Sequence, residues 1–556
     1  MEDYAYPRHY SPKNRQWPTR RLTKSPAWCA VDLRDGNQAL PKPMDPYQKE
    51  SYFKLLTDVG FKEIEIGFPA ASMDEWTFCR DLIERSLIPA DVTVSVLTQA
   101  REHIIKRTMN ALKGIHKAVC HIYIPISELH YRYVLGETRK ELVKRTLDSV
   151  RLVRKMADNE LNGSKIGLEF SPEEFTDADL DFAVELCDAV VETWEPRPGE
   201  KVIINLPCTV ERALPTFYPD RIEAFIEKST QRAKSIISLH AHNDMGGAVA
   251  STELALLAGG ERVEGTLFGN GERSGNLDLV TFAMNLQYLG IDTGLDFSEL
   301  EDLATKISEL TSMPIPPRQP YAGELVFTAF SGSHQDAIHK GLDRVEEIRK
   351  HFNGWKIPYL HINPATIGRS YAGAIRINSQ SGRGGIAHVL AESYGIQLPK
   401  ELLTELANHV QRRTEEAARE LRPDEIWDLF LHEFARPDTP LRLINYWPRP
   451  DVTNPSKIYS EVHLEMHGKG FVLHDVGDGP VSAFANAMRQ LNLPVFKLLN
   501  YEERSIGSTV DAESITIVSL EKLPEGKTFY GVGFGANIVQ GAVSAIVSSL
   551  NRMMRG

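Results

Sequence analysis

Two patterns of hydrophobic and polar positions, one typical of strands and one typical of helices, alternate along the first half of the chain. Short apolar runs of β type are each followed by a longer segment with apolar residues on one helical face. This strand–helix alternation indicates a parallel sheet. Eight such units in roughly 260 residues predict a closed (β/α)₈ barrel, whereas a doubly wound open sheet usually has fewer repeats and a glycine-rich phosphate loop after its first strand. The runs lie at 29–33, 63–68, 92–97, 118–124, 165–170, 201–206, 235–242 and 263–269.

The first helix of this barrel carries local signals at both ends. Asp45 suits the N-cap, Pro46 the first helical position and Gln48 the capping-box position. An apolar stripe over 52–59 follows, and Gly60 is placed to end the helix. The pattern therefore predicts a helix that begins at Pro46.

The rhythm changes after about residue 293. The proline-rich segment 314–320 predicts a linker or sharp turn, since each proline removes a donor and resists helix. Residues 321–440 read as mainly helical, and β-type runs return from about residue 440. There, 476–491 resembles 532–550 as strand, glycine turn and helix, which suggests a pseudo-symmetric α+β domain. We expect an N-terminal extension at 1–27, the barrel at 28–312, helical linker subdomains at 313–440 and a C-terminal regulatory domain at 441–556.

Composition narrows the class of protein. The net charge of −12 argues against nucleic acid as a partner, because nucleic-acid binding needs a basic face. Apolar runs stay shorter than the roughly 20 residues of a membrane span, and the N-terminus lacks the apolar core of a secretory signal. The five cysteines form no CxxC pair, so we expect buried reduced thiols in a cytoplasmic protein.

The end of the seventh run favours a metal site. His240 and His242 are two residues apart, so their imidazoles share one face of a strand and can reach one ion. Asn276, in the glycine-rich loop after the eighth run, adds a neutral oxygen, and Asp35 adds a carboxylate after the first. Such a set suits a divalent ion with open positions; we expect Mg²⁺, although Mn²⁺ and Zn²⁺ tolerate the same ligands.

The remaining runs also end in polar residues. In a barrel the carboxyl ends of the strands meet at one mouth, where active sites form. For Arg34 the alternative interpretation is an ion pair with Asp35 that closes the mouth, and Glu63 and Glu65 are either inward-facing groups or salt-bridge partners. The other polar strand ends are His121 and Tyr123 after run four, Ser171 and Glu173 after run five, and Asn205, Pro207 and Thr209 after run six.

Taken in order, these segments resemble the DRE-TIM metallolyase superfamily and, within it, the longer class of the 2-isopropylmalate synthase family. The barrel motifs are LRDGNQ (33–38), EIEIGFPAAS (63–72), HIYIPIS (121–127), FSPEEF (170–175), HAHND (240–244) and GNGERSGN (269–276). Beyond the barrel they are SGSHQDAIHKG (331–341), IPYLHINPATIGRSY (357–371) and INSQSGRGG (377–385).

The resemblance implies a role for each matching position. Metal ligands fall on Asp35, His240 and His242 with Asn276 nearby, and Arg34 matches an arginine that contacts the keto acid. Positions that line the substrate pocket are His121, Tyr123, Ser171, Asn205, Pro207 and Thr209. Glu173, His334 and Tyr359 match catalytic positions, the last two reaching the barrel mouth of the partner subunit in a homodimer. Without the resemblance, His334 reads as a histidine on a surface helix.

The resemblance also implies the reaction and its control. The family condenses acetyl-CoA with 3-methyl-2-oxobutanoate to give 2-isopropylmalate and CoA in leucine biosynthesis. Leucine is the implied inhibitor, and Gly477, Gly479, Gly533 and Gly535 are expected to let backbone approach it, or else are ordinary turn glycines. The alternatives are a homocitrate or citramalate synthase, and a lyase acting on 3-hydroxy-3-methylglutaryl-CoA, which generally lacks the C-terminal extension. A non-catalytic binding protein would not need these polar strand ends.

Overall fold

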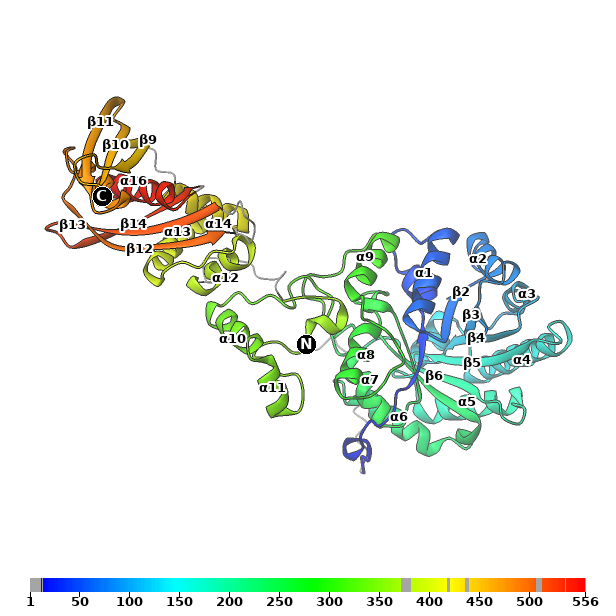
Figure 1. The fold of residues 1–556 in the computed structure, drawn as a ribbon. Coiled ribbons are helices and arrows are strands. Elements are labelled where there is room, and N and C mark those ends of the chain that lie inside the picture. Colours follow the sequence, from blue (N-terminus) through cyan, green and yellow to red (C-terminus); the bar gives the residue numbers. More distant parts are fainter. Residues whose placement is uncertain are drawn as a thin grey trace. The chain divides into compact units, whose positions relative to one another are not determined.

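Eight parallel strands close into a barrel, as the sequence predicts (Figure 1). The computed structural model describes residues 12, 14–371, 382–417, 421–435, 440–506, 513–535 and 537–555. Most of the motif at 377–385 lies outside these residues. The strands are β1 Ala27–Ala30, β2 Glu63–Gly67, β3 Thr93–Gln99, β4 Lys117–Pro125, β5 Lys165–Glu173, β6 Val202–Cys208, β7 Ser235–Ala241 and β8 Arg262–Gly265.

The first strand ends earlier than its apolar run suggests. After Val31 the backbone turns into a π-helix, Asp32–Gly36, because the amides of Arg34, Asp35 and Gly36 all donate to the Val31 carbonyl. This turn carries Arg34 and Asp35 sideways over the barrel mouth instead of continuing along the barrel wall.

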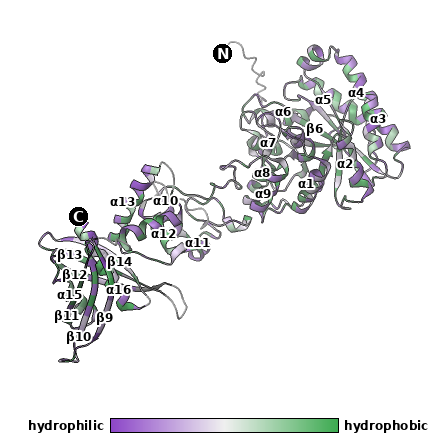
Figure 2. Cartoon of the chain, turned by 90° about the horizontal axis from the view of Figure 1, so that it is seen from above, coloured by the Kyte–Doolittle hydropathy of each residue, from purple (hydrophilic) through white to green (hydrophobic). Residues whose placement is uncertain are grey.

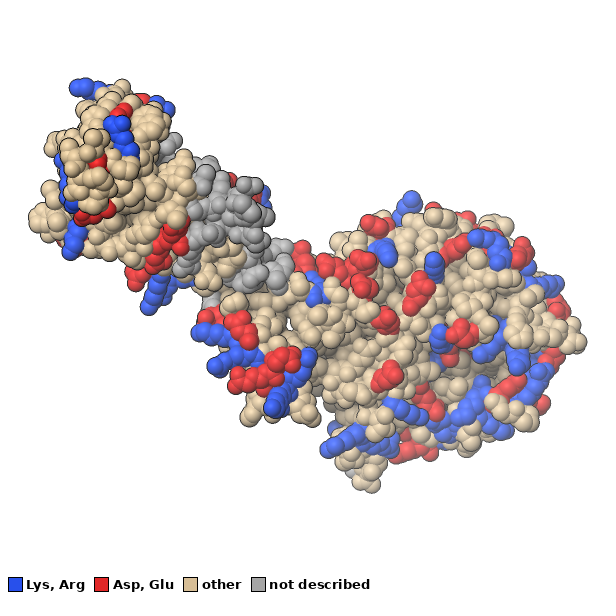
Figure 3. All heavy atoms as spheres, in the orientation of Figure 1, with Lys and Arg blue, Asp and Glu red and all other residues tan. Residues whose placement is uncertain are grey.

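Helices cover the outside of the barrel, and Figure 2 shows hydrophilic and hydrophobic residues together on them. The predicted first helix is confirmed: Asp45 forms the capping box with Gln48, and Gly60 ends the helix at φ 114°. In Figure 3 acidic and basic side chains intermingle over the visible face of the barrel. The helices are α1 Pro46–Val59, α2 Met73–Glu84, α3 Glu102–Ala111, α4 Arg139–Asn159, α5 Leu180–Trp194, α6 Phe217–Lys228, α7 Ala248–Leu257, α8 Leu279–Tyr288 and α9 Leu300–Thr311.

The chain folds as two compact units, the first of which comprises residues 1–326 and 364–369. Within it, the N-terminal segment packs on α6, where Arg15 and Trp17 both donate to the buried Asp220. The proline-rich segment is also tied to the barrel, because Gln319 Nε2 donates to Asp278 Oδ2 at 2.7 Å. None of the helices in the described part of the chain is long and apolar enough to cross a membrane.

The second unit comprises residues 327–363 and 370–556 and is helical first and β-rich afterwards, as predicted. The predicted boundary near residue 440 lies inside this unit. Its helices are α10 Gly332–Leu342, α11 Val345–Phe352, α12 Gly382–Tyr394, α13 Lys400–Ala417, α14 Pro423–Phe430, α15 Pro480–Met488 and α16 Ile538–Arg555. Its strands are β9 Leu441–Pro450, β10 Ile458–Met466, β11 Lys469–Gly477, β12 Phe496–Ile506, β13 Glu513–Lys522 and β14 Lys527–Gly535.

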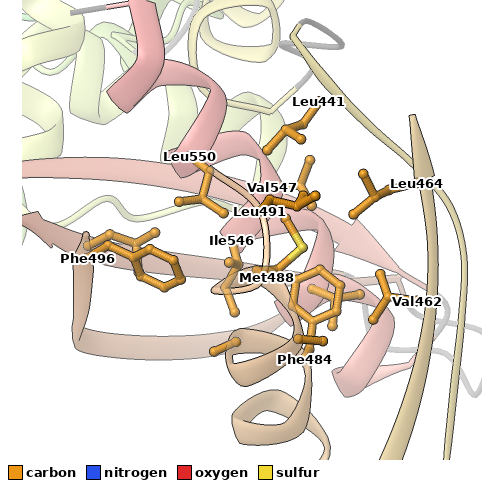
Figure 4. Close-up of a cluster of buried hydrophobic side chains, with 14 of the residues drawn as sticks. Leu441, Val462, Leu464, Phe484, Met488, Leu491, Phe496, Ile546, Val547 and Leu550 are labelled. Atoms are coloured by element: carbon orange, nitrogen blue, oxygen red, sulfur yellow. The ribbon is translucent and has the colours of Figure 1, made fainter. Parts of the chain in front are cut away.

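The suspected duplication is a repeated unit of three antiparallel strands and a helix. Strands β9–β11 precede α15, and strands β12–β14 precede α16, each set forming its own three-stranded sheet. Both repeats contribute to one core, in which Phe484 and Met488 of α15 lie near Ile546 and Leu550 of α16 (Figure 4). A second core joins α12–α14 to β13 and β14 through Ile515, Ile517 and Val532 among others.

Candidate active site

The carboxyl ends of the barrel strands converge on one cavity of about 200 Å³. Eleven of the residues singled out in the sequence line it, together with four others. The lining comprises Arg34, Asp35, Gln38, Leu97, His121, Tyr123, Ser171, Glu173, Asn205, Pro207, Thr209, His240, His242, Glu272 and Arg273.

Three of these side chains form a cluster that could hold a metal ion. One ligand atom from each of Asp35, His240 and His242 lies within 4.8 Å of the others, and all three residues are buried. Asp35 Oδ2 is 3.3 Å from His240 Nε2 and 3.9 Å from His242 Nε2. The π-helix therefore delivers a carboxylate directly beside the two imidazoles of β7.

The donor set fits a divalent cation. The Asp35 Oδ2 and Asn276 Oδ1 atoms are buried and have no hydrogen-bond partner among the described residues. Asn276 also bridges to His242 through the backbone, so its side chain belongs to the same corner of the mouth. Buried oxygens without donors cost free energy unless something else satisfies them. Two imidazoles and two such oxygens suit Mg²⁺, Mn²⁺ or Zn²⁺.

The charges of this cluster separate its two histidines. Burial alone would lower the pKa of His240, but the adjacent carboxylates of Asp35 and Glu264 raise that pKa to about 9. Burial and the neighbouring His240 lower the pKa of His242 to about 4. Burial would raise the pKa of Asp35, yet Arg34 and His240 hold it well below the ordinary value. Asp35 is therefore an ionised carboxylate and His242 a neutral imidazole, the forms in which these side chains can bind a cation.

Arg34 sits between two carboxylates at the mouth. Its Nη1 donates to Asp35 Oδ1 at 2.8 Å and its Nε to Glu65 Oε2 at 2.6 Å. Burial would lower the pKa of Arg34, but these carboxylates raise it above the ordinary value. The Arg34–Asp35 ion pair considered from the sequence is present, and Glu65 faces inward. Arg34 is therefore a fixed positive charge next to the metal cluster.

A hydrogen-bonded chain continues from Glu65 around the mouth. Glu65 Oε1 lies 2.7 Å from His121 Nδ1, and His121 Nε2 lies 2.7 Å from Ser171 Oγ. Asn205 Nδ2 then donates to Ser171 Oγ at 2.9 Å and to Glu264 Oε2 at 3.0 Å.

Glu264 completes this chain as a ring, because its Oε2 also lies 2.8 Å from His240 Nδ1. His240 leads back through Asp35 to Arg34. The candidate metal-binding residues Asp35 and His240 and three of the predicted substrate residues, His121, Ser171 and Asn205, are therefore connected in one network of hydrogen bonds and ion pairs.

Three further predicted residues, Glu173, Tyr123 and Thr209, line the same cavity. Burial and the adjacent Glu174 raise the pKa of Glu173 above its ordinary value, so this carboxyl holds a proton more readily than an exposed one. Burial also raises the pKa of Tyr123, whose hydroxyl accepts a hydrogen bond from Gln99 at 2.8 Å. Thr209 Oγ1 accepts from the Glu174 amide at 2.8 Å, so Thr209 also helps to hold the loop beside Glu173.

His334 and Tyr359 lie in the second unit and contact each other. His334 is in α10, and its ring stacks on that of Tyr359 with the centroids 3.8 Å apart and an interplanar angle of 19°. Tyr359 is 64% exposed. A ring stack this exposed is available to a ligand or a partner, whereas an ordinary surface histidine has no such neighbour.

The four glycines of the repeat serve mainly the packing of strand on helix. A Cβ at Gly477 would lie 2.3 Å from the Ala483 amide nitrogen, and one at Gly533 would lie 2.1 Å from the Gly541 carbonyl oxygen. Gly535 is equally close to α16, whereas a Cβ at Gly479 would meet open space. At three of the four positions the close approach is to the chain's own helix, and their contact with leucine stays a prediction.

A group of charged side chains inside the barrel was not predicted from the sequence. Arg262 and Glu264 on β8 and Glu169 on β5 are each at most 1% exposed. Arg262 binds both glutamates, and Gln38 Nε2 donates to Asp35 Oδ1 at 2.9 Å near the mouth. Charged residues inside otherwise apolar runs were the available signal, because such groups are almost never buried without partners.

Family models and curated relatives match the chain over almost its whole length. Residues 25–307 match the HMGL-like family, 324–391 the alpha-isopropylmalate synthase post-catalytic domain-like family, and 420–554 the LeuA allosteric (dimerisation) domain. The 2-isopropylmalate synthase of Clostridium acetobutylicum is 46% identical over 545 residues, 97% of each chain. That of Rhodospirillum rubrum is 44% identical over 540 residues, 97% of this chain and 96% of the relative. The chain therefore belongs to the 2-isopropylmalate synthase family.

Proposed function

We propose that the chain condenses acetyl-CoA with 3-methyl-2-oxobutanoate and that water then hydrolyses the resulting CoA thioester, which gives 2-isopropylmalate and free CoA in leucine biosynthesis. The observation that carries this proposal is the cluster of Asp35, His240 and His242 beside Arg34 at the mouth of the barrel. A divalent ion, for which we propose Mg²⁺ with Mn²⁺ or Zn²⁺ as alternatives, would polarise the ketone of the keto acid there. The five cysteines are buried and unpaired, which supports a cytoplasmic location.

In the proposed reaction Arg34 stabilises the negative charge that develops during condensation. When a new carbon–carbon bond forms at the ketone, its oxygen becomes an alkoxide, and a fixed cation stabilises that charge best. Arg34 is held by two carboxylates and is 11% exposed, so it needs little reorganisation. His121, Tyr123, Ser171, Asn205, Pro207 and Thr209 then surround the keto acid.

A base must also remove a methyl proton from acetyl-CoA. We assign removal of this proton to His334 acting with Glu173, since an imidazole is the most common general base in enzymes and burial raises the pKa of the Glu173 carboxyl. Tyr359 orients the His334 ring through the stack. We further propose a homodimer in which this pair from one protomer completes the barrel mouth of the other, in keeping with the matched dimerisation domain.

Release of free CoA from acetyl-CoA with a panel of 2-oxo acids tests the reaction. We expect 3-methyl-2-oxobutanoate to be preferred; equal rates with pyruvate or 2-oxoglutarate would refute the substrate assignment. His334→Ala should abolish turnover while keto-acid binding persists, and unchanged turnover would remove His334 from the mechanism. Asp35→Ala should lose metal-dependent activity. The control is the activity of the same variant after the metal has been removed with a chelator, which should be no lower.

Regulation by leucine is a separate proposal supported by the allosteric domain matched at 420–554. Allostery requires a second site and a second state that the ligand favours. A leucine titration of the full chain, repeated on a variant that ends near residue 440, should show inhibition only in the full chain. Equal inhibition of both proteins would place leucine elsewhere.

A further inference from the structure

We propose that Glu264, held by Arg262, is a positioning residue that fixes the metal ligand His240 and the substrate-pocket residue Asn205 at the same time. This inference rests on the proposed function, because it assigns Glu264 a role in the site where the cation and the keto acid bind. Glu264 lies on β8 and is 1% exposed.

Three side chains donate hydrogen bonds to the Glu264 carboxylate, and the carboxyl group of Glu169 is hydrogen-bonded with it as well. Its Oε2 lies 2.8 Å from His240 Nδ1 and accepts from Asn205 Nδ2 at 3.0 Å. Its Oε1 accepts from Arg262 Nη1 at 2.5 Å. An ionised carboxylate only accepts, so one side chain can satisfy all three donors.

The contact with His240 decides which ring nitrogen faces the cation. Because Glu264 only accepts, Nδ1 must carry a hydrogen, and Nε2 is the nitrogen left to act as a metal ligand. That nitrogen is the one 3.3 Å from Asp35 Oδ2. A carboxylate on the far nitrogen also fixes the plane of a ligating imidazole and increases its basicity.

The contact with Asn205 decides which way its amide points. Glu264 can bind only the NH₂ end of this amide, which also donates to Ser171 Oγ at 2.9 Å. The oxygen end, Asn205 Oδ1, is buried and has no partner among the described residues. Asn205 lines the cavity, so Glu264 leaves this acceptor available to a ligand that donates a hydrogen bond.

Arg262 explains how a carboxylate persists this deep in the barrel. Its Nε donates to Glu63 Oε2 at 2.7 Å and its Nη1 lies 3.2 Å from Glu169 Oε1, in addition to the bond with Glu264. A buried charge is costly unless it is paired and hydrogen-bonded. Arg262 therefore supplies the counter-charge and fixes one oxygen of Glu264, so that the other faces His240 and Asn205.

Glu169 offers a matched control. It is as buried as Glu264 and shares Arg262 as its ion-pair partner. The imidazole that it approaches is that of His121, whose Nε2 lies 3.9 Å from Glu169 Oε1. Replacing Glu169 therefore disturbs the same buried charges without touching the proposed metal ligand.

The test measures Mn²⁺ binding to the metal-stripped full chain by electron paramagnetic resonance of the free ion. The variants are Glu264→Gln, Glu264→Asp, Glu169→Gln and Asp35→Ala. The glutamine in Glu264→Gln must turn its NH₂ group toward one of the three donors, which leaves that donor without an acceptor. The aspartate in Glu264→Asp keeps the charge but is shorter by one methylene, so its carboxylate lies farther from His240. We expect both changes to weaken Mn²⁺ binding about 10- to 100-fold, and Glu169→Gln to stay within about threefold of the parent.

Circular dichroism of the metal-free proteins identifies folded variants, and Glu264→Asp carries the test if Glu264→Gln does not fold. Parent-like binding by either folded Glu264 variant would overturn the inference, as would an equal loss in Glu169→Gln. Failure of the proposed metal site gives a different result: the parent would bind no Mn²⁺, or Asp35→Ala would bind it as tightly as the parent.

Discussion

Asp32→Asn should make the barrel less sensitive to rising pH. Asp32 is 3% exposed, and its Oδ1 accepts from the Tyr52 hydroxyl at 2.7 Å and from the Leu267 amide at 2.8 Å. Its Oδ2 is buried without a partner among the described residues. Burial raises the pKa of Asp32 to about 7 in spite of the two donors. Ionisation of this side chain therefore costs more in the folded protein than in the unfolded chain.

The size of the effect follows from the two pKa values. The folded pKa of about 7 exceeds the ordinary value of 3.8, so the stabilising contribution of Asp32 is complete below pH 3.8 and is lost as the pH rises through 7. A shift of this size corresponds to about 4 kcal/mol in full, and to about 3 kcal/mol between pH 5 and pH 8. An asparagine accepts from both donors and never ionises. Its NH₂ would take the place of the unpartnered Oδ2 and would lower the free energy of unfolding by about 1–3 kcal/mol at every pH.

Urea unfolding of parent and variant at pH 5 and pH 8 measures this difference. The free energy of unfolding of Asp32→Asn, relative to the parent, should rise by about 3 kcal/mol over this range. Thr252→Val is the control, because it removes a buried hydroxyl that does not titrate. A parent–variant difference that is the same at both pH values would show that Asp32 is not perturbed as argued.

Three further changes test packing and buried charge. Phe484→Ala in the shared core of the repeats should lower the free energy of unfolding of the second unit by about 3–5 kcal/mol in urea titrations, leaving Mn²⁺ binding unchanged. Gly533→Ala should lower the free energy of unfolding of the second unit by about 1–3 kcal/mol, because its Cβ would meet backbone at 2.1 Å, whereas Gly479→Ala should be near neutral in the same urea titrations. Lys49→Met should destabilise the barrel by about 3–5 kcal/mol, because it leaves the partly buried Glu75 without its 2.7 Å partner, and adding Glu75→Gln should recover part of the loss.

The barrel could be predicted because buried parallel strands appear as continuous apolar runs. The end of the first strand could not. The run CAVDL continues to Leu33 with Asp32 as its only charged residue, and no glycine or proline lies between Cys29 and Gly36. The turn after Val31 depends on three amides that share one carbonyl, which no local residue type announces. The same turn places Asp35, so the position of this proposed metal ligand could not be predicted from the sequence, although the residue itself could be singled out.

The buried charges behind the site could not be assigned from the sequence for a related reason. His240 and His242 could be assigned to one face because their spacing lies within a single strand. The partner of His240 lies on another strand, and Glu264 stands beside it only because β7 and β8 pair in that register. Likewise His121 pairs with Glu169 across β4 and β5. Register between parallel strands is set by closure of the whole barrel, so inner charges remained unassigned although their presence in apolar runs was visible.

The two repeats of the second unit differ in the pattern of apolar residues along their strands, and this difference indicates which sheet is covered on both faces. Strand β10 alternates, with buried Val462 and Leu464 separated by the partly exposed His463. Strand β13 does not alternate, because Ile517 packs on the helices α12–α14 while Val518 packs on the shared core. A strand that is apolar on both sides requires cover on both faces. The loss of alternation in SITIVSL thus predicts a second layer over the second sheet, and helices that precede the domain boundary expected at residue 440 supply it.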